Sequence, residues 1–229
     1  MNKVKYKNII FDLDGTLTDS KQGIINSVYA ACNKLNVNIP GSGHFHLSIG
    51  IPLQEYFRTT IGISDEKIDE AVQYFREYYA QKGVYENQLY AGIENLLRDL
   101  SADAGLFIAT SKLEKYALVV LDHFNIRKYF TGIAGADASG IHAGKTELVR
   151  KIIRLHSIGN SGATVMVGDK KMDIDAANDC GIESIGITYG YGSKEEIIRA
   201  CPTFVAASVE ELGILLLNGG IQQTLKMIL

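Results

Sequence analysis

Short apolar runs that alternate with helical patterns restrict the fold of this chain more than any other feature. Four runs have the length and composition of strands buried on both faces, at 9–11, 106–109, 165–167 and 185–187. Between the second and third runs, apolar residues recur at helical spacing over 118–124 and 149–153. Strands that alternate with helices of this length are typical of βαβ units. The sequence therefore predicts an α/β fold built on a parallel sheet.

Residues 20 to about 87 depart from this alternation. Apolar residues at helical spacing predict one helix over 24–35 and another over 68–79. Between them, "SIGIPLQEYF" at 48–57 has the composition of a Gly/Pro loop that enters a further helix. No buried strand is indicated in this span. We therefore expect a sheet-containing part, residues 1–17 and 88–229, interrupted by a helical insert, residues 18–87.

The composition excludes several classes of protein. A net charge of −3 and a pI near 6.0 give no basic face for a nucleic acid polymer. No stretch approaches the roughly 18 apolar residues of a membrane span, and Asp12 interrupts the only apolar run near the N-terminus. Three cysteines without metal-type spacing favour reduced thiols. These features predict a cytoplasmic protein that binds neither membrane nor nucleic acid. The oligomeric state is open, with a monomer or a homodimer as the two alternatives.

Polar side chains gather where the predicted strands end, or at the start of a helix. The residues concerned are Asp12, Asp14, Thr110, Ser111, Lys145, Asp169 and Asp173. In an open α/β sheet, ligands bind in the crevice outside the carboxyl ends of the strands. The shared position of these residues therefore predicts a binding site there.

Each polar group also has a purely structural explanation. Asp14 with Gly15 has the composition of a hairpin turn, although helical sequence follows it. Thr110 and Ser111 could cap a helix that starts near Lys112. Lys145 alone resembles a solvated helix lysine, and "GDKKMD" resembles a capped helix with Asp173 exposed. "HFH" at 44–46 has metal-ligand spacing, but it lies in a Gly/Ser loop without a third ligand, so a surface loop is the better interpretation.

Carboxylates gathered at one place repel one another unless a cation is present. Asp12 and Asp14 are two residues apart, so an extended backbone directs both side chains to one side. Asp169 adds a further charge, and Asp173 lies one helical turn from it. Oxygen ligands of this kind suit Mg²⁺. Lys145 and the Thr110 hydroxyl supply donors for an anion beside the metal, which is the equipment for phosphoryl transfer.

The order of these motifs resembles that of the haloacid dehalogenase-like hydrolases, in particular the phosphoglycolate-phosphatase-like and 5′-nucleotidase-like branch with a helical cap. "FDLDGTLTDS" matches the first motif of the family, "FIATSK" the second, Lys145 the third and "VMVGDKKMD" the fourth. "LYAGIENLL" and "ITYGYG" extend the likeness across nearly the whole chain. One departure is Ala91, where this branch usually has Pro. The resemblance implies a Rossmann-like parallel-sheet core with an inserted α-helical cap.

The resemblance also implies a role for each site residue. Asp12 would be the nucleophile that forms an aspartyl-phosphate, and Asp14 the acid and base that serves the leaving group and water. The substrate phosphate would be bound by Thr110, Ser111 and Lys145. Mg²⁺ would be held by Asp12, the Asp14 carbonyl group, Asp169 and Asp173. The expected activity is Mg²⁺-dependent hydrolysis of a small phosphomonoester, a phosphorylated metabolite such as phosphoglycolate or a nucleotide.

Two other functions use similar residues. A non-hydrolytic phospho-acceptor switch also combines acids, Thr and Lys at strand ends, but its acceptor aspartate lies in a mid-chain strand and lacks a second Asp two residues on. A sugar phosphomutase of the same fold keeps both acids. Related mutases place a cap histidine ten residues after the second acid, where this chain has Ile24. Hydrolysis is therefore expected, with substrate choice set by the insert near 48–57.

Overall fold

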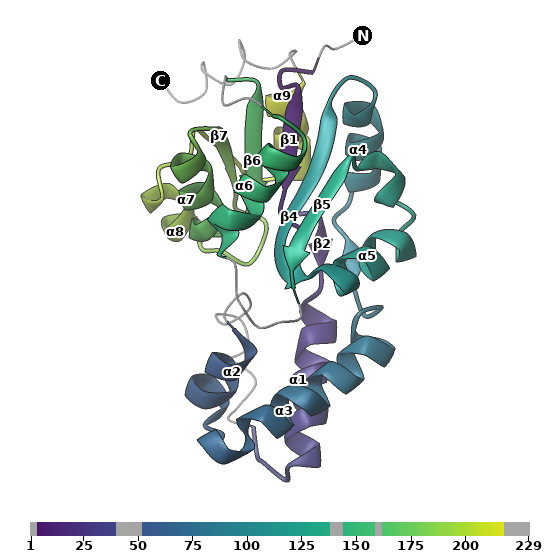
Figure 1. The fold of residues 1–229 in the computed structure, drawn as a ribbon, viewed down its shortest axis with the longest axis vertical. Helices are drawn as coiled ribbons and strands as arrows, with labels where there is room; N and C mark the ends of the chain where they lie inside the picture. The colour runs from purple at the N-terminus through teal and green to yellow at the C-terminus, as the bar shows by residue number, and fades with distance from the viewer. Residues whose placement is uncertain (1–3, 40–51, 138–143, 159–161, 218–229) are drawn as a thin grey trace. The chain divides into compact units, whose positions relative to one another are not determined.

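The computed structural model describes residues 4–39, 52–137, 144–158 and 162–217 of the chain, shown in Figure 1. The chain divides into two compact units. The first, called here the sheet unit, comprises Met1–Thr18 and Leu89–Leu229, and the second, the helical unit, comprises Asp19–Gln88. A two-stranded ribbon of β2 (Thr18–Asp19) and β3 (Gln88–Leu89) marks the two places where the chain passes between the units.

The sheet unit contains a parallel sheet with β1 near its centre. Its strands, in spatial order, are β5 (Gly132–Ala136), β4 (Gly105–Leu113), β1 (Asn8–Phe11), β6 (Thr164–Gly168), β7 (Glu183–Ile187) and β8 (Phe204–Ala206). Phe11, the last residue of β1, is in register with Ile108 of β4 and Val167 of β6. Because all neighbouring pairs are parallel, the chain leaves these three strands at one edge of the sheet.

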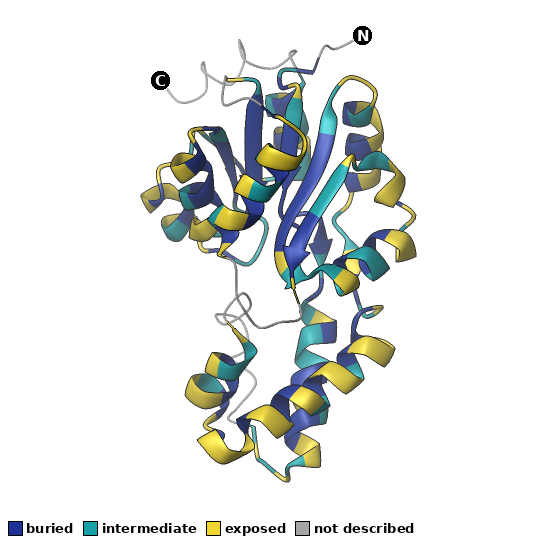
Figure 2. Cartoon of the chain, in the orientation of Figure 1, coloured by how far each residue is buried: buried dark blue, intermediate teal, exposed yellow. Residues whose placement is uncertain are grey.

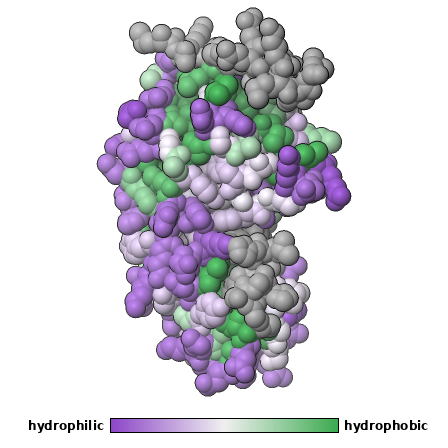
Figure 3. Space-filling model, turned by 180° about the vertical axis from the view of Figure 1, so that it is seen from behind, coloured by the Kyte–Doolittle hydropathy of each residue, from purple (hydrophilic) through white to green (hydrophobic). Residues whose placement is uncertain are grey.

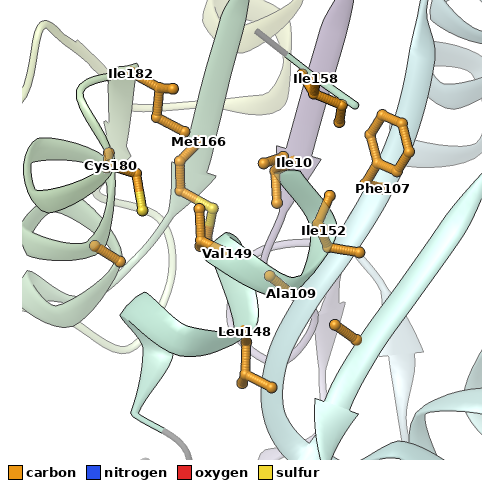
Figure 4. Close-up of a cluster of buried hydrophobic side chains, with 13 residues drawn as sticks. Ile10, Phe107, Ala109, Leu148, Val149, Ile152, Ile158, Met166, Cys180 and Ile182 are labelled. Atoms are coloured by element: carbon orange, nitrogen blue, oxygen red, sulfur yellow. The ribbon is translucent and has the colours of Figure 1, made fainter. Parts of the chain in front are cut away.

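Helices cover both faces of this sheet, with α6 in front of it and α9 behind it in Figure 1. Their bounds are α4 (Ile93–Ser101), α5 (Glu114–His123), α6 (Lys145–Leu155), α7 (Lys171–Cys180), α8 (Lys194–Arg199) and α9 (Val209–Leu216). Leu148, Val149 and Ile152 of α6 pack on strand residues such as Ile10 and Met166 (Figure 4). Burial of each such side chain is worth about 1.5–3 kcal/mol, which fixes α6 on the sheet.

The helical unit is built on α1 (Lys21–Lys34) and α3 (Asp65–Tyr78), with a short α2 (Leu53–Tyr56). Two π-helical turns, Phe57–Ile61 and Tyr79–Gly83, continue α2 and α3. Phe75 lies at the centre of an aromatic group: its ring stacks on Tyr79 at 5.7 Å and meets Phe57 edge-on at 6.4 Å between centroids. The inward faces are buried and the outward faces exposed, as Figure 2 shows for both units.

The α/β prediction is confirmed, including the four strands and the four helices expected from periodicity. Two short strands, β5 and β8, carry no such signal, because "GIAGA" has two glycines and "FVA" only three residues. The helix expected to start near Lys112 is present as α5, but it begins at Glu114, because β4 continues to Leu113. The segment "HFH" and residues 218–229 lie outside the described residues.

The surface shown in Figure 3 mixes hydrophilic residues with smaller hydrophobic areas. The large hydrophobic side chains that are exposed come from separate elements: Tyr29, Tyr85, Leu155, Met172, Ile198, Val205 and Ile214. Among the described residues, no helix combines the length and the apolar character required to cross a bilayer.

Candidate active site

The predicted site residues lie at the carboxyl ends of three neighbouring strands. Asp12 directly follows β1, and its backbone N–H continues the ladder by donating to the Val167 carbonyl group of β6 at 2.9 Å. Asp169 directly follows β6, and Thr110 lies in β4 beyond Ala109. Asp12, Thr110 and Asp169 are all buried. The strand register thus brings together groups that are up to 157 residues apart in the chain, from Asp12 to Asp169.

Lys145 connects these groups. It is the first residue of α6, and its side chain is only 2% exposed. Its Nζ lies 2.9 Å from Asp12 Oδ1 and 3.0 Å from Asp173 Oδ1, and it donates to the Ala109 carbonyl group at 3.1 Å. A buried ammonium group with three such partners is not a solvated helix lysine. The purely structural explanation of Lys145 is therefore wrong.

Asp173 lies in the first turn of α7 and is fully buried, so the alternative explanation of an exposed residue in a capped helix is also wrong. Its Oδ2 accepts the Lys170 N–H at 3.0 Å, which caps the helix. The same carboxylate reaches Lys145 through Oδ1. Asp173 therefore contacts both the start of α7 and Lys145.

The electrostatics of the cluster are unfavourable without a further cation. Burial and the charge of Asp12 raise the pKa of Asp169 to about 6. Burial also raises the pKa of Asp173, although Lys145 opposes the shift. Burial disfavours the charge on Lys145, but Asp12 and Asp173 outweigh it and raise the pKa of the ammonium group. Three carboxylates thus share one lysine, and their charged forms require compensation.

A metal ion bound to the three carboxylates would compensate their negative charge. Asp12, Asp169 and Asp173 each offer an oxygen, and these oxygens lie within 4.8 Å of one another. All three residues are buried. Oxygen-only donors with excess negative charge match the preference of hard divalent cations. The side chain of Asp14 lies outside this group.

Asp14 is paired with a residue that the sequence did not single out as a ligand or catalytic group. Lys112 Nζ lies 2.5 Å from Asp14 Oδ2, and its side chain is 6% exposed. Thr18 donates to Asp14 Oδ1 at 3.5 Å. The sequence pattern placed Lys112 at the start of a helix, where lysines are usually solvated. Its position after Thr110 and Ser111, beyond a buried strand, was the available signal.

Thr110 and Ser111 have different environments. Thr110 is buried, and its Oγ1 accepts the Lys112 N–H at 3.2 Å across an irregularity in the pairing of β4 with β5. Neither residue caps α5, which follows Leu113 without a side-chain cap. Ser111 is exposed, and its Oγ lies 3.9 Å from Met172 Sδ. Lys145 contacts the carbonyl group of Ala109, the residue before Thr110, whereas the Ser111 side chain contacts Met172 of α7.

Two glycines allow the backbone to approach Asp169 closely. Gly15 has φ of +85°, and a Cβ there would come within 2.4 Å of Asp169 Oδ2. A Cβ on Gly190 would lie 2.4 Å from the Asp169 Cβ and 2.3 Å from the Gly15 carbonyl oxygen. Any side chain at either position would displace the carboxylate. The turn after β1 and the segment after β7 therefore enclose Asp169.

Comparison with known proteins agrees with this geometry. The family model of the haloacid dehalogenase-like hydrolases matches residues 9–187, a span that includes the whole acidic cluster. The chain belongs to this family. The matched span runs from β1 to β7 and includes the helical unit between β2 and β3.

Three relatives illustrate the range of proteins similar to this family member. A 5′-nucleotidase of Pseudomonas aeruginosa is 35% identical over 210 residues, covering 91% of this chain and 95% of the relative. A phosphoglycolate phosphatase of Vibrio parahaemolyticus is 30% identical and covers 93% and 96%. The structure of Protein Tyrosine Kinase A of Mycobacterium tuberculosis superposes with a TM-score of 0.80 at 34% identity, over 93% of this chain and 98% of that one.

Proposed function

We propose that the chain is a Mg²⁺-dependent phosphatase that hydrolyses small phosphomonoesters through an aspartyl-phosphate on Asp12. The observation that carries this proposal is the buried lysine Lys145, held between Asp12 and Asp173 at the edge of the sheet. A cation fixed beside an acid cluster can stabilise a phosphoryl group during transfer, because negative charge is distributed over the phosphoryl oxygens in the transition state. The similarity to a nucleotidase and a phosphoglycolate phosphatase supports small phosphorylated metabolites as substrates.

In the first half of the reaction, a carboxylate oxygen of Asp12 attacks the phosphorus atom. The bond from phosphorus to the leaving oxygen breaks, and Asp14 donates its proton to that oxygen. Lys145 and the Thr110 hydroxyl bind the phosphoryl oxygens, and the Ser111 backbone assists them. Asp12 Oδ1 is already held by the Leu13 N–H at 2.7 Å, which fixes the orientation of the carboxylate for attack.

In the second half, Asp14 accepts a proton from water, and the water oxygen attacks the phosphorus atom. The bond to Asp12 breaks, and inorganic phosphate leaves. Lys112 keeps the Asp14 carboxylate in place for both proton transfers. Asp12, Asp169 and Asp173, with the Asp14 carbonyl group, would hold Mg²⁺, which when bound neutralises the charge that develops on the phosphoryl oxygens.

The helical unit supplies the choice of substrate in this proposal. The sheet unit contains the reacting groups, while the segment 48–57 belongs to the insert. An insert that encloses the substrate would keep bulk water from the site during transfer. A cytoplasmic location stays a prediction from composition, and a monomer or a homodimer are the two alternatives for the oligomeric state.

Phosphate release from a panel of phosphomonoesters tests the proposal. Purified full-length protein is incubated with 2-phosphoglycolate, nucleoside monophosphates, hexose phosphates and a generic aryl phosphate, with Mg²⁺ or with EDTA. We expect Mg²⁺-dependent release from at least one metabolite and from the aryl phosphate. No release from any of them, from folded protein with Mg²⁺ present, would contradict the proposal.

Transfer to a protein tyrosine is the second candidate, because a structure named for tyrosine kinase activity superposes on nearly the whole chain. In that reaction a tyrosine hydroxyl replaces water as the final acceptor. Labelled ATP with a Glu/Tyr copolymer separates the two: label in the copolymer supports the transferase, and an unlabelled copolymer together with phosphate release from a phosphomonoester supports the phosphatase. A hexose 1-phosphate with its bisphosphate activator tests the mutase, which predicts more isomerised sugar phosphate than free phosphate.

A further inference from the structure

Tyr189 lies just beyond β7 and contacts the turn that follows β1. Its hydroxyl group donates to the Thr16 carbonyl oxygen at 3.1 Å. Its ring meets the ring of Tyr90 edge-on, with 5.0 Å between centroids. Burial raises the pKa of Tyr189, so its hydroxyl stays a neutral donor across the working pH range. The Tyr189 hydroxyl therefore supports the backbone of the turn that follows β1.

Thr16 is the residue that Tyr189 holds, and it contacts the proposed metal site. Thr16 is fully buried, and its Oγ1 donates to Asp169 Oδ1 at 3.3 Å. The other oxygen of this carboxylate, Oδ2, accepts the Tyr191 N–H at 2.8 Å. Both oxygens of Asp169 are thus oriented by two segments, the 15–18 turn and the 189–192 segment. The Tyr189 hydroxyl joins these segments to each other.

Tyr90 supports the same turn from another direction. Its N–H donates to the Leu17 carbonyl group at 3.1 Å, one residue beyond the carbonyl group that Tyr189 holds. The two rings pack together, so the turn is fixed at two consecutive carbonyl groups by two contacting tyrosines. Such support restricts the position of Thr16. It therefore also restricts the direction from which the Thr16 hydroxyl donates its hydrogen bond to Asp169.

We propose that Tyr189 is a positioning residue for the metal site, which orients Asp169 through Thr16 without contacting the metal or the substrate. The inference rests on the proposed metal-dependent function. Without the Tyr189 hydroxyl, the turn loses the hydrogen bond that holds its Thr16 carbonyl group. Asp169 then adopts the ligating orientation for a smaller fraction of the time. Metal affinity falls, whereas the reaction of the metal-saturated enzyme keeps its rate.

Tyr189→Phe tests this inference, because it removes the hydroxyl and keeps the ring that packs on Tyr90. Tyr6→Phe is the matched control: Tyr6 is buried and its hydroxyl donates to Glu183, the first residue of β7, at the opposite end of the sheet. Mg²⁺ binding to full-length protein is measured by titration calorimetry, and turnover of an aryl phosphate is measured at saturating Mg²⁺. Thr16→Val removes the second hydrogen bond of the path.

We expect Tyr189→Phe to raise the Mg²⁺ dissociation constant about 5-fold, the change that corresponds to one ordinary hydrogen bond. Thr16→Val should raise it about 10-fold, as loss of an outer-shell partner does. In the double variant, the increase in the Mg²⁺ dissociation constant should be smaller than the product of the two single increases, because both substitutions act through the same chain of hydrogen bonds. Tyr6→Phe should lower the melting temperature without changing Mg²⁺ affinity, and kcat at saturating Mg²⁺ should stay within about 2-fold in Tyr189→Phe.

The outcomes separate this inference from the function on which it rests. Wild-type protein that does not bind Mg²⁺ would remove the proposed function itself. If wild-type protein binds Mg²⁺ and Tyr189→Phe binds it equally well, only the role of Tyr189 is overturned. A Tyr189→Phe protein that fails to fold, or an equal loss of affinity in Tyr6→Phe, would assign the hydroxyl a general structural role and would overturn the inference as well.

Discussion

The two units of the chain treat buried polar groups differently. In the sheet unit, charged side chains are buried after two strands, at Asp12 and Asp169, and at the starts of two helices, at Lys145 and Asp173. Among the described residues of the helical unit, the buried polar side chains are uncharged: Ser20, Ser27 and Asn87. Its core is aliphatic and aromatic, with the group around Phe75 at its centre.

This difference indicates that the reacting groups of the proposed reaction lie in the sheet unit. An uncompensated buried charge costs several kcal/mol, so a domain retains such charges only where another interaction offsets the cost. In the sheet unit, that cost is accepted at four positions that share one edge of the sheet. The helical unit follows the ordinary rules of core packing. Substitutions that affect the reaction step should therefore concentrate in the sheet unit.

The largest effect on this comparison is expected from Asp12→Asn. We expect phosphatase activity to fall by about 10³-fold or more, because the amide cannot serve as the nucleophile. The variant should fold, since the substitution removes one charge from a crowded cluster and Lys145 keeps Asp173 as a partner. Phosphate release and thermal unfolding are measured together. An active Asp12→Asn protein would exclude this residue as the nucleophile.

Lys145→Met should have the next largest effect. The rate should fall about 10²- to 10³-fold, as for other well-placed electrostatic donors. Metal-free Lys145→Met should also lose stability, by about 3–5 kcal/mol, because Asp173 is left buried without its cation. Lys151→Met, a half-exposed lysine on the same helix, serves as the control, and urea unfolding gives the free energies. Equal stability of the two variants would show that Lys145 is not the cation that this cluster needs.

Much of the fold could be predicted from local periodicity alone. The runs at 9–11 and 165–167 are apolar throughout, because both faces of β1 and β6 are covered by helices. The strand β5 could not be found this way, since its "GIAGA" sequence is determined by the close approach of a neighbouring segment. A Cβ on Gly135 would lie 2.6 Å from the Glu114 Cα. Such a requirement is tertiary, and the sequence does not reveal it.

The candidate site divides in the same way. Asp12, Asp169 and Lys145 were predictable, because they occur in family motifs, and Asp12 and Asp169 also follow apolar runs. Lys112 and Tyr189 were not, because their partners, Asp14 and Thr16, lie 98 and 173 residues away in the chain. The sequence indicates which residue types a reaction needs, whereas the residues that hold them in place follow only from the packed structure.

A smaller effect is expected from Asp169→Asn, which separates metal binding from stability. Mg²⁺ affinity should fall about 10-fold or more, because the amide provides no charge to the ligand set. The metal-free variant should melt at a higher temperature than wild type, since burial and Asp12 disfavour the charge on Asp169. Calorimetric titration and melting curves with and without Mg²⁺ measure both. Unchanged activity at limiting Mg²⁺ would contradict the assignment of Asp169 as a ligand.

The smallest effects should come from the helical unit, and they should concern the choice of substrate. Within 48–57, Tyr56 and Phe57 belong to the buried core, so Gln54 and the exposed Glu55 are the residues to change. Gln54→Ala and Glu55→Ala should alter stability by less than about 0.5 kcal/mol, as expected for substitutions away from the core.

The ratio of kcat/KM between two metabolites should shift by about 10-fold in at least one of these variants, the value of one lost contact to a leaving group. An aryl phosphate that carries no metabolite leaving group should react at nearly the wild-type rate, because the reacting residues lie in the sheet unit. Glu66→Gln, exposed on α3 outside the segment, should leave the ratio unchanged. If neither variant changes the order of substrates while Glu66→Gln does, the specificity of the enzyme depends on α3 rather than on 48–57. That outcome would contradict the assignment of substrate choice to this segment of the helical unit.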